Sequence, residues 1–310
     1  MPKISVVMPV YNTPENFLRL AINSILNQTI ADLELIIVND GSQKTDVEGT
    51  VSSYQDDRIH YFYQDNLGAG VARNYGMKKA TGDYLYFMDS DDSLDTNALK
   101  ELHSIAEENG ADVVFFNLVK TPETGIKKTD FHFKMTTPSP CTKLFKRSFI
   151  QKFNLQFENL KSCNDLTFTY TAMALAKNVW KINKAYYYYN QENPNSISKS
   201  RGKNSDCLIF AMNALKENLQ KHNIYKKFLN DFNDTYIGCV NYELEHTENK
   251  KSFLSKIKKE NKYVYDHVTK KIWFGKEKRP NGHRCIYLFG VKILSYHHKK
   301  KNKGLPKEKK

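Results

Sequence analysis

The sequence has little cysteine. Its five cysteines are odd in number and scattered over 310 residues, with no pair at a zinc-binding spacing; they are Cys141, Cys163, Cys207, Cys239 and Cys285. This pattern excludes a disulfide framework and a cysteine zinc site. We therefore expect a protein of a reducing compartment.

Long apolar runs and a secretory pattern are also lacking. No apolar stretch approaches the roughly 20 residues that cross a bilayer. Residues 2–3 lead directly into the strand-like segment 4–8 rather than into a three-part signal. We expect a cytoplasmic protein, either free or held peripherally at the inner face of the cytoplasmic membrane.

Acidic residues are scarce toward the C-terminus. Residues 250–310 hold 20 Lys and Arg against four acids, whereas the first 249 residues hold 27 basic and 30 acidic residues. The net charge of +13 therefore belongs to the last fifth of the chain. Such an extension attracts nucleic acid or anionic lipid headgroups, unless it is simply solvated. Because no nucleic-acid-binding motif accompanies it, we expect an anionic membrane surface rather than nucleic acid as its partner.

The first half alternates strand-like and helix-like segments. Strands are expected at 4–9, 33–38, 59–62, 84–88 and 111–116, and helices at 16–28, 46–55, 70–80 and 97–109. This order predicts an α/β fold with a mostly parallel central sheet and helices on both faces. The second half is less regular, with helices expected at 165–176, 205–222 and 230–245 and a strand at 185–189.

Three carboxylates crowd the end of one expected strand. Asp89, Asp91 and Asp92 stand within four positions, directly after segment 82–88. In a partly dry site such like charges raise one another's pKa unless a cation lies among them. Mg²⁺ and Mn²⁺ favour oxygen ligands and bring substrate phosphates with them. The alternative is a solvated acidic turn, but parallel sheets bind ligands at the carboxyl ends of their strands, which favours a site.

Four segments, taken together, resemble glycosyltransferase family 2. They are ISVVMPVYN at 4–12 with Glu15 following, VNDGS at 38–42, NLGAGVARN at 66–74 and DSDD at 89–92. The resemblance is dense over residues 3–118 and thins beyond them. It implies the GT-A fold, in which two Rossmann-like halves abut, and metal-dependent, inverting sugar transfer from a nucleotide-sugar donor, usually a UDP-sugar.

The resemblance also implies where the nucleotide base would bind. Pro9 and Tyr11, with Glu15 after them, would line the base pocket. Asp40 would accept a hydrogen bond from the base; its alternative is an ordinary turn residue in Asp-Gly-Ser.

Further roles are implied near the donor diphosphate. Gly68 and Gly70 would allow close backbone approach to the donor, unless they simply form a loop that enters a helix. Arg73 would lie near the diphosphate or Asp92, with a surface ion pair as its alternative. Asp89 would touch the ribose or the metal hydration shell, and Asp91 would bind Mn²⁺ or Mg²⁺ directly, neutralising the leaving group.

The general base is expected in the second half of the chain. The family usually supplies it as the Asp of a Glu-Asp pair that opens a helix, and the matching segment here is 162–168. Asn164 replaces the Glu, while Asp165 keeps the base position. The alternative for Asp165 is an ordinary helix cap.

Two more segments match the family weakly. Residues 140–147 resemble the link between the donor and acceptor halves. Residues 186–189, with Ser196, Ser198 and Arg201, resemble the segment that folds over the diphosphate, or else form a solvated polar loop. We expect three parts: a nucleotide-sugar-binding half at 1–118, an acceptor-side half at 119–204, and a helical, basic extension at 205–310.

The resemblance implies single-sugar transfer to a glycan or glycolipid acceptor in cell-surface polysaccharide or lipooligosaccharide synthesis. The Gln-x-x-Arg-Trp pattern of processive synthases is absent from the sequence. Two alternatives stay open: a non-catalytic relative that binds nucleotide-sugar, and a basic nucleic-acid-binding protein.

Overall fold

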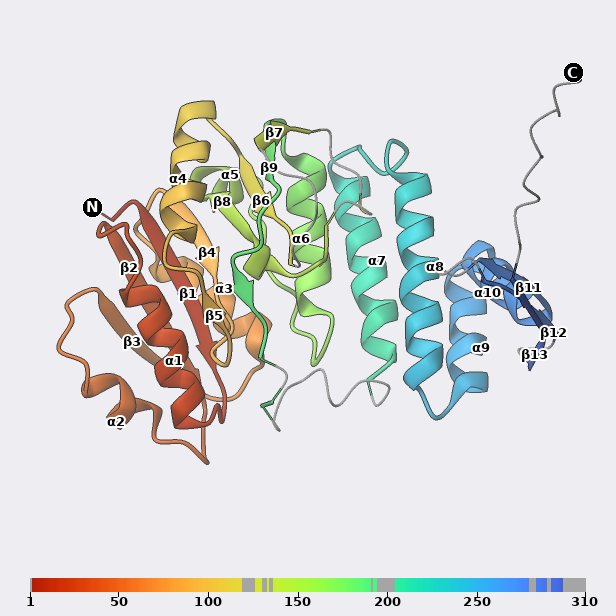
Figure 1. Ribbon diagram of the computed structural model, residues 1–310, viewed down its shortest axis with the longest axis horizontal. Helices are drawn as coiled ribbons and strands as arrows, with labels where there is room; N and C mark the ends of the chain where they lie inside the picture. Colours follow the sequence, from red (N-terminus) through yellow and green to blue (C-terminus); the bar gives the residue numbers. More distant parts are fainter. Residues whose placement is uncertain are drawn as a thin grey trace, which may run out of the picture.

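The computed structural model describes residues 2–118, 126–129, 133, 136–190, 192–193, 204–278, 283–288 and 291–297. Within them, an eight-stranded sheet has the order β3-β2-β1-β4-β8-β6-β9-β7 (Figure 1). Its strands are β1 (Ile4–Val10), β2 (Leu33–Asp40), β3 (Ile59–Gln64), β4 (Tyr84–Phe87), β6 (Val113–Phe116), β7 (Ile126–Lys128), β8 (Lys143–Lys146) and β9 (Val179–Ile182). Only β7 and β8 run against the other strands of this sheet, which confirms a mostly parallel sheet.

Helices cover both faces of the sheet, as predicted. On one face α1 (Glu15–Leu26), α2 (Val47–Ser52) and α4 (Ala98–Asn109) bury their apolar stripes in one cluster with alternate residues of β1. On the other face α3 (Ala69–Lys79), α5 (Arg147–Lys152) and α6 (Asn164–Leu175) pack in a second cluster. Strands β1 and β2 are buried along their whole length, which explains their continuous apolar character.

The C-terminal region is helical, as predicted. It comprises α7 (Asp206–Lys221), α8 (Leu229–His246), α9 (Lys250–Glu260) and α10 (Lys262–Trp273), which continue the packing beyond α6 (Figure 1). The basic stretch from Lys250 begins as two packed helices, because Phe253, Ile257, Val264 and Val268 are buried in the same cluster as α6. A wholly solvated tail is therefore the wrong description of residues 250–269.

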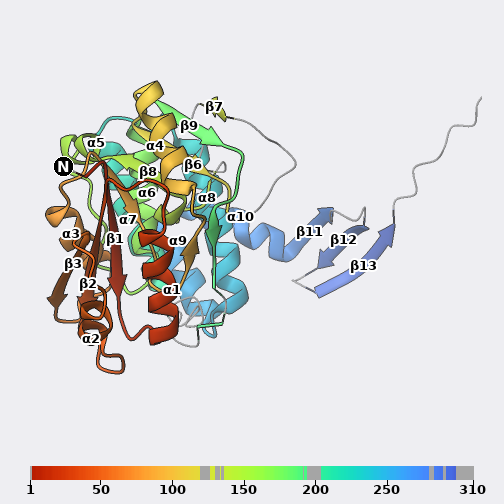
Figure 2. The same cartoon turned by 60° about the vertical axis from the view of Figure 1, so that its left-hand side comes forward.

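Some elements differ from the sequence pattern. The expected strand at 185–189 is only β10 (Tyr187–Tyr188), which pairs with β5 (Ser93–Leu94) outside the main sheet. Strands β11 (Phe274–Lys278), β12 (His283–Leu288) and β13 (Val291–His297) form an antiparallel sheet that follows α10, and they were not predicted (Figure 2). No helix in the described part of the chain is long and apolar enough to cross a membrane.

Candidate active site

The carboxyl ends of β1, β2 and β4 meet at one edge of the sheet. The parallel register places Val10 beside Asn39, and the Met88 amide donates to the Val7 carbonyl just past the end of β4. The loops that follow these three strands therefore converge. Tyr11, Asp89 and Asp91 lie in these loops, with Pro9 and Asp40 at the strand ends beside them, and we call this edge the rim.

The loops after β1 and β2 are bonded to one another. Asn12 adopts a left-handed backbone conformation with φ of 50°. Its side-chain Oδ1 accepts from the amides of Gln43 and Lys44, both at 2.8 Å, and its own amide donates to Ser42 Oγ at 3.0 Å. The neighbouring Tyr11 is 50% exposed, so its ring is accessible to a ligand. Pro9 pairs with Val38 inside the sheet, where it shapes the strand end rather than the open surface.

Asp40 anchors the loop that enters α3. Its Oδ1 accepts from Gln64 Nε2 at 2.7 Å and from the Leu67 amide at 2.9 Å, and its Oδ2 accepts from the Gly68 amide at 2.9 Å. Asp40 is 2% exposed, and these bonds occupy three of the roughly four acceptor positions of a carboxylate. Gly68 has φ of +95°, which only glycine adopts readily.

Gly70 serves helix packing. A Cβ at this position would stand 2.4 Å from the Glu158 carbonyl and 3.2 Å from Asn164 Cβ. The missing side chain thus lets α3 approach the start of α6. The predicted close approach to the donor is not tested for either glycine.

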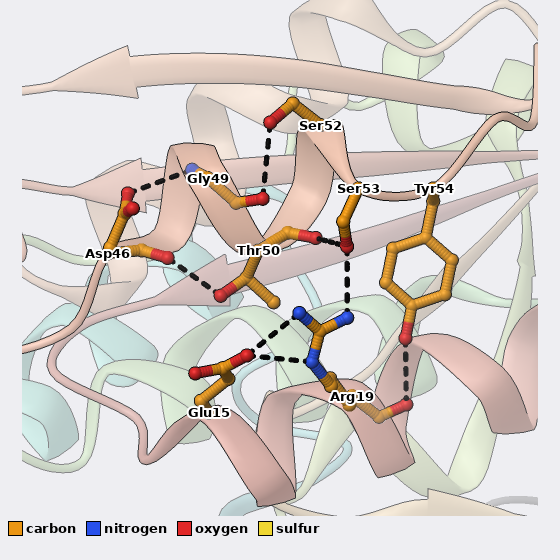
Figure 3. Close-up of polar contacts among 8 residues, drawn as sticks. All are labelled: Glu15, Arg19, Asp46, Gly49, Thr50, Ser52, Ser53 and Tyr54. Atoms are coloured by element: carbon orange, nitrogen blue, oxygen red, sulfur yellow. Dashed lines mark hydrogen bonds and ion pairs between the residues drawn. The ribbon is translucent and has the colours of Figure 1, made fainter.

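Glu15 lies in a separate contact network on α1 and α2 (Figure 3). Its carboxylate pairs with Arg19 at 2.7 Å, and Arg19 Nη1 donates to Ser53 Oγ at 2.9 Å. Both charged side chains are largely exposed. The structure therefore shows Glu15 fixing the first turn of α1, and its predicted part in the base pocket stays a prediction.

The carboxylates after β4 are held by a segment from the second half of the chain. The Asn190 amide donates to Asp92 Oδ1 at 2.7 Å, and Asn193 Nδ2 donates to Asp91 Oδ2 at 2.6 Å. The Asp89 amide donates to the Tyr187 hydroxyl at 3.3 Å. Tyr187, Asn190 and Asn193 thus lie against this acidic cluster. Ser196, Ser198 and Arg201, which the sequence predicts here, lie outside the described residues.

Burial and neighbouring negative charge raise the pKa of two carboxylates in the acidic cluster. Burial, followed by the negative charge of Asp89, raises the pKa of Asp92 to about 7. Burial and Asp89 also raise the pKa of Asp91, although the Asn193 bond opposes them. Asp92 is 1% exposed, and it was predicted only as a member of the three-carboxylate cluster, with no role of its own. Its position next to Asp91 was the sequence feature that could have pointed to a role for Asp92 in the site.

Arg73 joins the rim to the start of α6. Its Nη2 donates to Asp89 Oδ1 at 2.6 Å, and its Nη1 donates to Asn164 Oδ1 at 3.0 Å. The guanidinium is buried beneath the Phe157 ring, 5.4 Å from its centroid. Burial opposes the charge, but Asp89 and Asp165 outweigh it and raise the Arg73 pKa. A surface ion pair is therefore the wrong description of Arg73.

The first turn of α6 presents Asp165 to the same place. The preceding Cys163 takes a left-handed conformation with φ of 56°, so the chain turns sharply into the helix. Asn164 is buried by its bond to Arg73, whereas Asp165 is half-buried. Burial raises the Asp165 pKa and the charge of Asp89 adds to this, while Arg73 and Lys143 lower it. A half-buried carboxylate with a raised pKa beside two cations can accept a proton.

A metal site is not complete from protein side chains alone. Among the described residues, no group of three or more His, Cys, Asp or Glu side chains is arranged to hold a metal ion. Mg²⁺ is commonly held by one or two carboxylates with substrate phosphates and water. Asp89 and Asp91 could contribute two such carboxylates, and burial, with the charge of Asp89 adding to it, raises the pKa of Asp91.

Two cavities in the described residues lie away from this site. One of about 630 Å³ is at the amino ends of β2 and β3, with Glu34, His60 and Lys79 among its lining residues. The other, of about 410 Å³, is beside Asp95 and Glu101. Neither cavity is lined by Asp40, Asp91 or Asp165, so it is the convergence of charged side chains that identifies the candidate site.

A family comparison matches more than half of the chain. The model of the family described as Glycosyl transferase family 2 covers residues 5–177, which include the rim and the start of α6. This segment ends just past α6, so the matched part carries both Asp91 and Asp165.

Curated relatives are glycosyltransferases of bacteria. TarP of Staphylococcus aureus, a poly(ribitol-phosphate) beta-N-acetylglucosaminyltransferase, is 30% identical over 249 residues, 73% of this chain and 75% of TarP. EpsJ of Bacillus subtilis, an uncharacterized glycosyltransferase, is 30% identical over 223 residues, 64% of each chain. GlyA of Streptococcus pneumoniae is 35% identical over 53% of this chain and 22% of its own. The chain thus spans less than two thirds of EpsJ and of GlyA.

Solved structures share the fold. S. aureus TarS 1–349 in complex with UDP-GlcNAc aligns with a TM-score of 0.61, covering 92% of this chain and 97% of that one, at 20% identity. The same TarS chain in complex with UDP aligns with a TM-score of 0.56. The alignment extends well past residue 177, so the C-terminal helices belong to the shared architecture.

Proposed function

Because the chain belongs to glycosyl transferase family 2 and is a glycosyltransferase, we propose that it transfers one sugar from a UDP-sugar to an acceptor hydroxyl, with inversion. The observation that carries this proposal is the Arg73 bridge. One buried guanidinium joins Asp89, on the donor side, to Asn164, which precedes Asp165. The leaving group and the attacking hydroxyl would therefore meet in one place.

The rim would bind the nucleotide. Tyr11 offers an exposed ring, and Asp40 keeps one acceptor position beside the Gly68 loop. The TarS structures with UDP-GlcNAc and UDP support a uridine donor for this fold. TarP, whose name gives N-acetylglucosamine as its sugar, supports an N-acetylhexosamine as the first donor to test.

Asp91, assisted by Asp89, would hold Mn²⁺ or Mg²⁺ against the donor diphosphate. When bound, the ion neutralises charge that develops on the nucleoside diphosphate as it leaves. Asn193 would hold the Asp91 carboxylate in place, and Arg73 would hold Asp89. Both bonds leave one oxygen of each carboxylate for a ligand.

Asp165 would act as the general base. It would take the proton of the acceptor hydroxyl while that oxygen attacks the anomeric carbon and the bond to the diphosphate breaks. Its raised pKa brings it closer to neutral pH, which favours proton acceptance in the transition state. Asn164 in place of Glu preserves the bond to Arg73, which argues for an intact site.

The acceptor would be a cell-surface glycan or glycolipid, as poly(ribitol-phosphate) in the name of TarP supports. We place the enzyme in the cytoplasm, held at the inner membrane face. Helices α9 and α10 carry exposed lysines that would attract anionic lipid, each contributing about 1 kcal/mol; they are Lys250, Lys251, Lys256, Lys258, Lys259 and Lys262. Co-sedimentation with phosphatidylglycerol vesicles, and none with phosphatidylcholine vesicles, is expected.

A nucleotide-sugar panel tests the function directly. Purified full-length chain is incubated with UDP-GlcNAc, UDP-GalNAc, UDP-glucose and UDP-galactose, with and without Mn²⁺, and release of UDP is measured. At least one donor is expected to be turned over faster than in the Asp165→Asn variant. If no nucleotide-sugar is either hydrolysed or bound, the proposed function is wrong.

A further inference from the structure

A fully buried lysine lies beneath the proposed base. Lys143 begins β8, the strand between β4 and β6, and is 0% exposed. Its Nζ donates to the carbonyls of Thr137 and Ser139, at 2.9 and 2.8 Å, and to Thr142 Oγ1 at 2.9 Å. Three oxygen acceptors match the three donors of an ammonium group. Buried lysines are rare unless they have a partner of this kind.

The packing of α6 on β8 brings this ammonium toward Asp165. Phe145 of β8 contacts Phe168 of α6, with ring centroids 5.4 Å apart. Lys143 lies two positions before Phe145 and so points to the same face of the sheet. Asp165 lies three positions before Phe168, on the same side of its helix. Because α6 and β8 pack through these two rings, Lys143 and Asp165 lie on the faces that these two elements turn toward each other.

Other charges also face Asp165. Arg73 of α3 lowers its pKa, and Asp89 beyond β4 raises it; Lys143 acts in the same direction as Arg73. The thiols of Cys163 and Cys239 and the hydroxyl of Tyr170 also adjoin it, but burial raises the pKa of each, so all three are neutral near pH 7. Arg73 is already shared with Asp89 and Asn164. Lys143 has no carboxylate in its hydrogen-bond set, so its charge is not committed to another acid; burial lowers its pKa to about 7, so this charge acts on Asp165 at and below neutral pH.

We propose that Lys143 is a positioning residue for the general base: its ammonium ties residues 137–142 under α6 and supplies the positive charge that keeps Asp165 ionised. The inference rests on the proposed function, because it assigns a partner to the base named there. It goes beyond that function by giving the charge of Asp165 an internal source in β8. The lysine touches no substrate.

The test separates the lysine's charge from its hydrogen bonds. Lys143→Gln removes the charge and keeps two donors, and Lys143→Met removes both. Lys177→Gln, an exposed lysine just beyond α6, is the control. In both Lys143 variants the acid limb of kcat/KM is expected to move about one unit to higher pH. Activity would then fall by up to about tenfold on the acid side of the wild-type limb and change little on its alkaline side.

A second readout needs no turnover. The Asp165 carboxyl is titrated by ¹³C NMR in wild type, in Lys143→Gln and in the control, and its titration is expected to move upward only in Lys143→Gln. Equal loss of activity at all pH values, with an unchanged Asp165 titration, would show a purely structural lysine. If the wild type transfers no sugar but the Asp165 titration still moves upward in Lys143→Gln, the proposed function is wrong and this inference stands. If Lys143→Met does not fold, Lys143→Gln alone decides.

Discussion

The two acidic parts of the site are built differently. At the rim, Asp89, Asp91 and Asp92 lie within four positions of the sequence; Asp92 is buried, the other two are half-buried, and the one arginine present bonds Asp89. At the start of α6, a single carboxylate, Asp165, faces two buried cations from different elements. The rim therefore has an excess of negative charge, whereas the α6 site is internally compensated.

This difference separates two chemical tasks. A cluster with uncompensated carboxylates is suited to an external cation and to the phosphates that come with it. A single carboxylate beside positively charged side chains of the protein can change its protonation state without a metal ion. Substitutions on one side should therefore leave the function of the other side intact.

Replacement of the base should have the largest effect. Asp165→Asn keeps the shape of the side chain but cannot accept a proton, so kcat should fall by about 10²- to 10⁴-fold. Affinity for UDP, measured by calorimetry, should stay unchanged because the rim is intact. Asp206→Asn, at the first turn of α7 with an exposed ion pair to Lys256, is the matched control. Weakened UDP binding in Asp165→Asn would remove the proposed separation.

Metal removal should affect only the rim. Chelation with EDTA should reduce wild-type turnover by about 10²-fold or more, because the leaving group loses its counter-charge. Asp91→Asn should need roughly tenfold more Mn²⁺ for half-maximal rate, with the pH profile preserved. Asp57→Asn, an acid at the opposite edge of the sheet, serves as control. Full activity in EDTA would show that the cluster needs no metal.

Loss of the bridge should disturb both parts at once. Arg73→Lys keeps the charge but cannot reach Asp89 and Asn164 with one planar group. Displacement of either side by about 1 Å is enough to lower kcat/KM by roughly 10²-fold. Arg58→Lys, which replaces another carboxylate-paired arginine at the opposite edge, should leave activity within twofold. An effect on UDP binding alone would show that Arg73 belongs only to the rim.

Lys143 should make stability depend on pH. Burial lowers its pKa from 10.5 to about 7, although Asp165 opposes the shift. Between these two values the unfolded chain holds a proton that the folded chain has released, so stability rises with pH. The slope is at most about 1.4 kcal/mol per pH unit. Urea unfolding from pH 6 to pH 10 should show this rise in wild type and not in Lys143→Met. Parallel curves would contradict the assigned pKa.

Much of the donor side could be predicted because its residues are local. Asp40 and Asp89–Asp92 follow apolar strand segments directly, and parallel strands bring their carboxyl ends to one edge. The start of α6 was also predicted to within one residue, since Asn164 and Asp165 precede a helical stretch.

The compensating cations could not be predicted in the same way. Lys143 belongs to a four-residue segment with lysine at both ends, which has no strand pattern of its own. Its burial follows from insertion between β4 and β6, whose paired residues lie 58 to 62 and 28 to 32 residues upstream. Asn190 and Asn193 likewise reach the acidic cluster from about 100 residues away. No pattern of residue spacing in the sequence predicts such long-range contacts.

The sequence by itself determined the alternating α/β order, the acidic rim and the place of Asp165, because each depends on neighbouring residues and on strand or helix periodicity. Only the tertiary structure decided that Arg73 is a buried bridge, that Gly70 serves packing, and that Lys143 underlies the base. Those roles depend on which segments, far apart in the sequence, pack together and exclude water in the folded protein. Burial is a property of the whole fold, and it is burial that turns an ordinary arginine or lysine into part of a site.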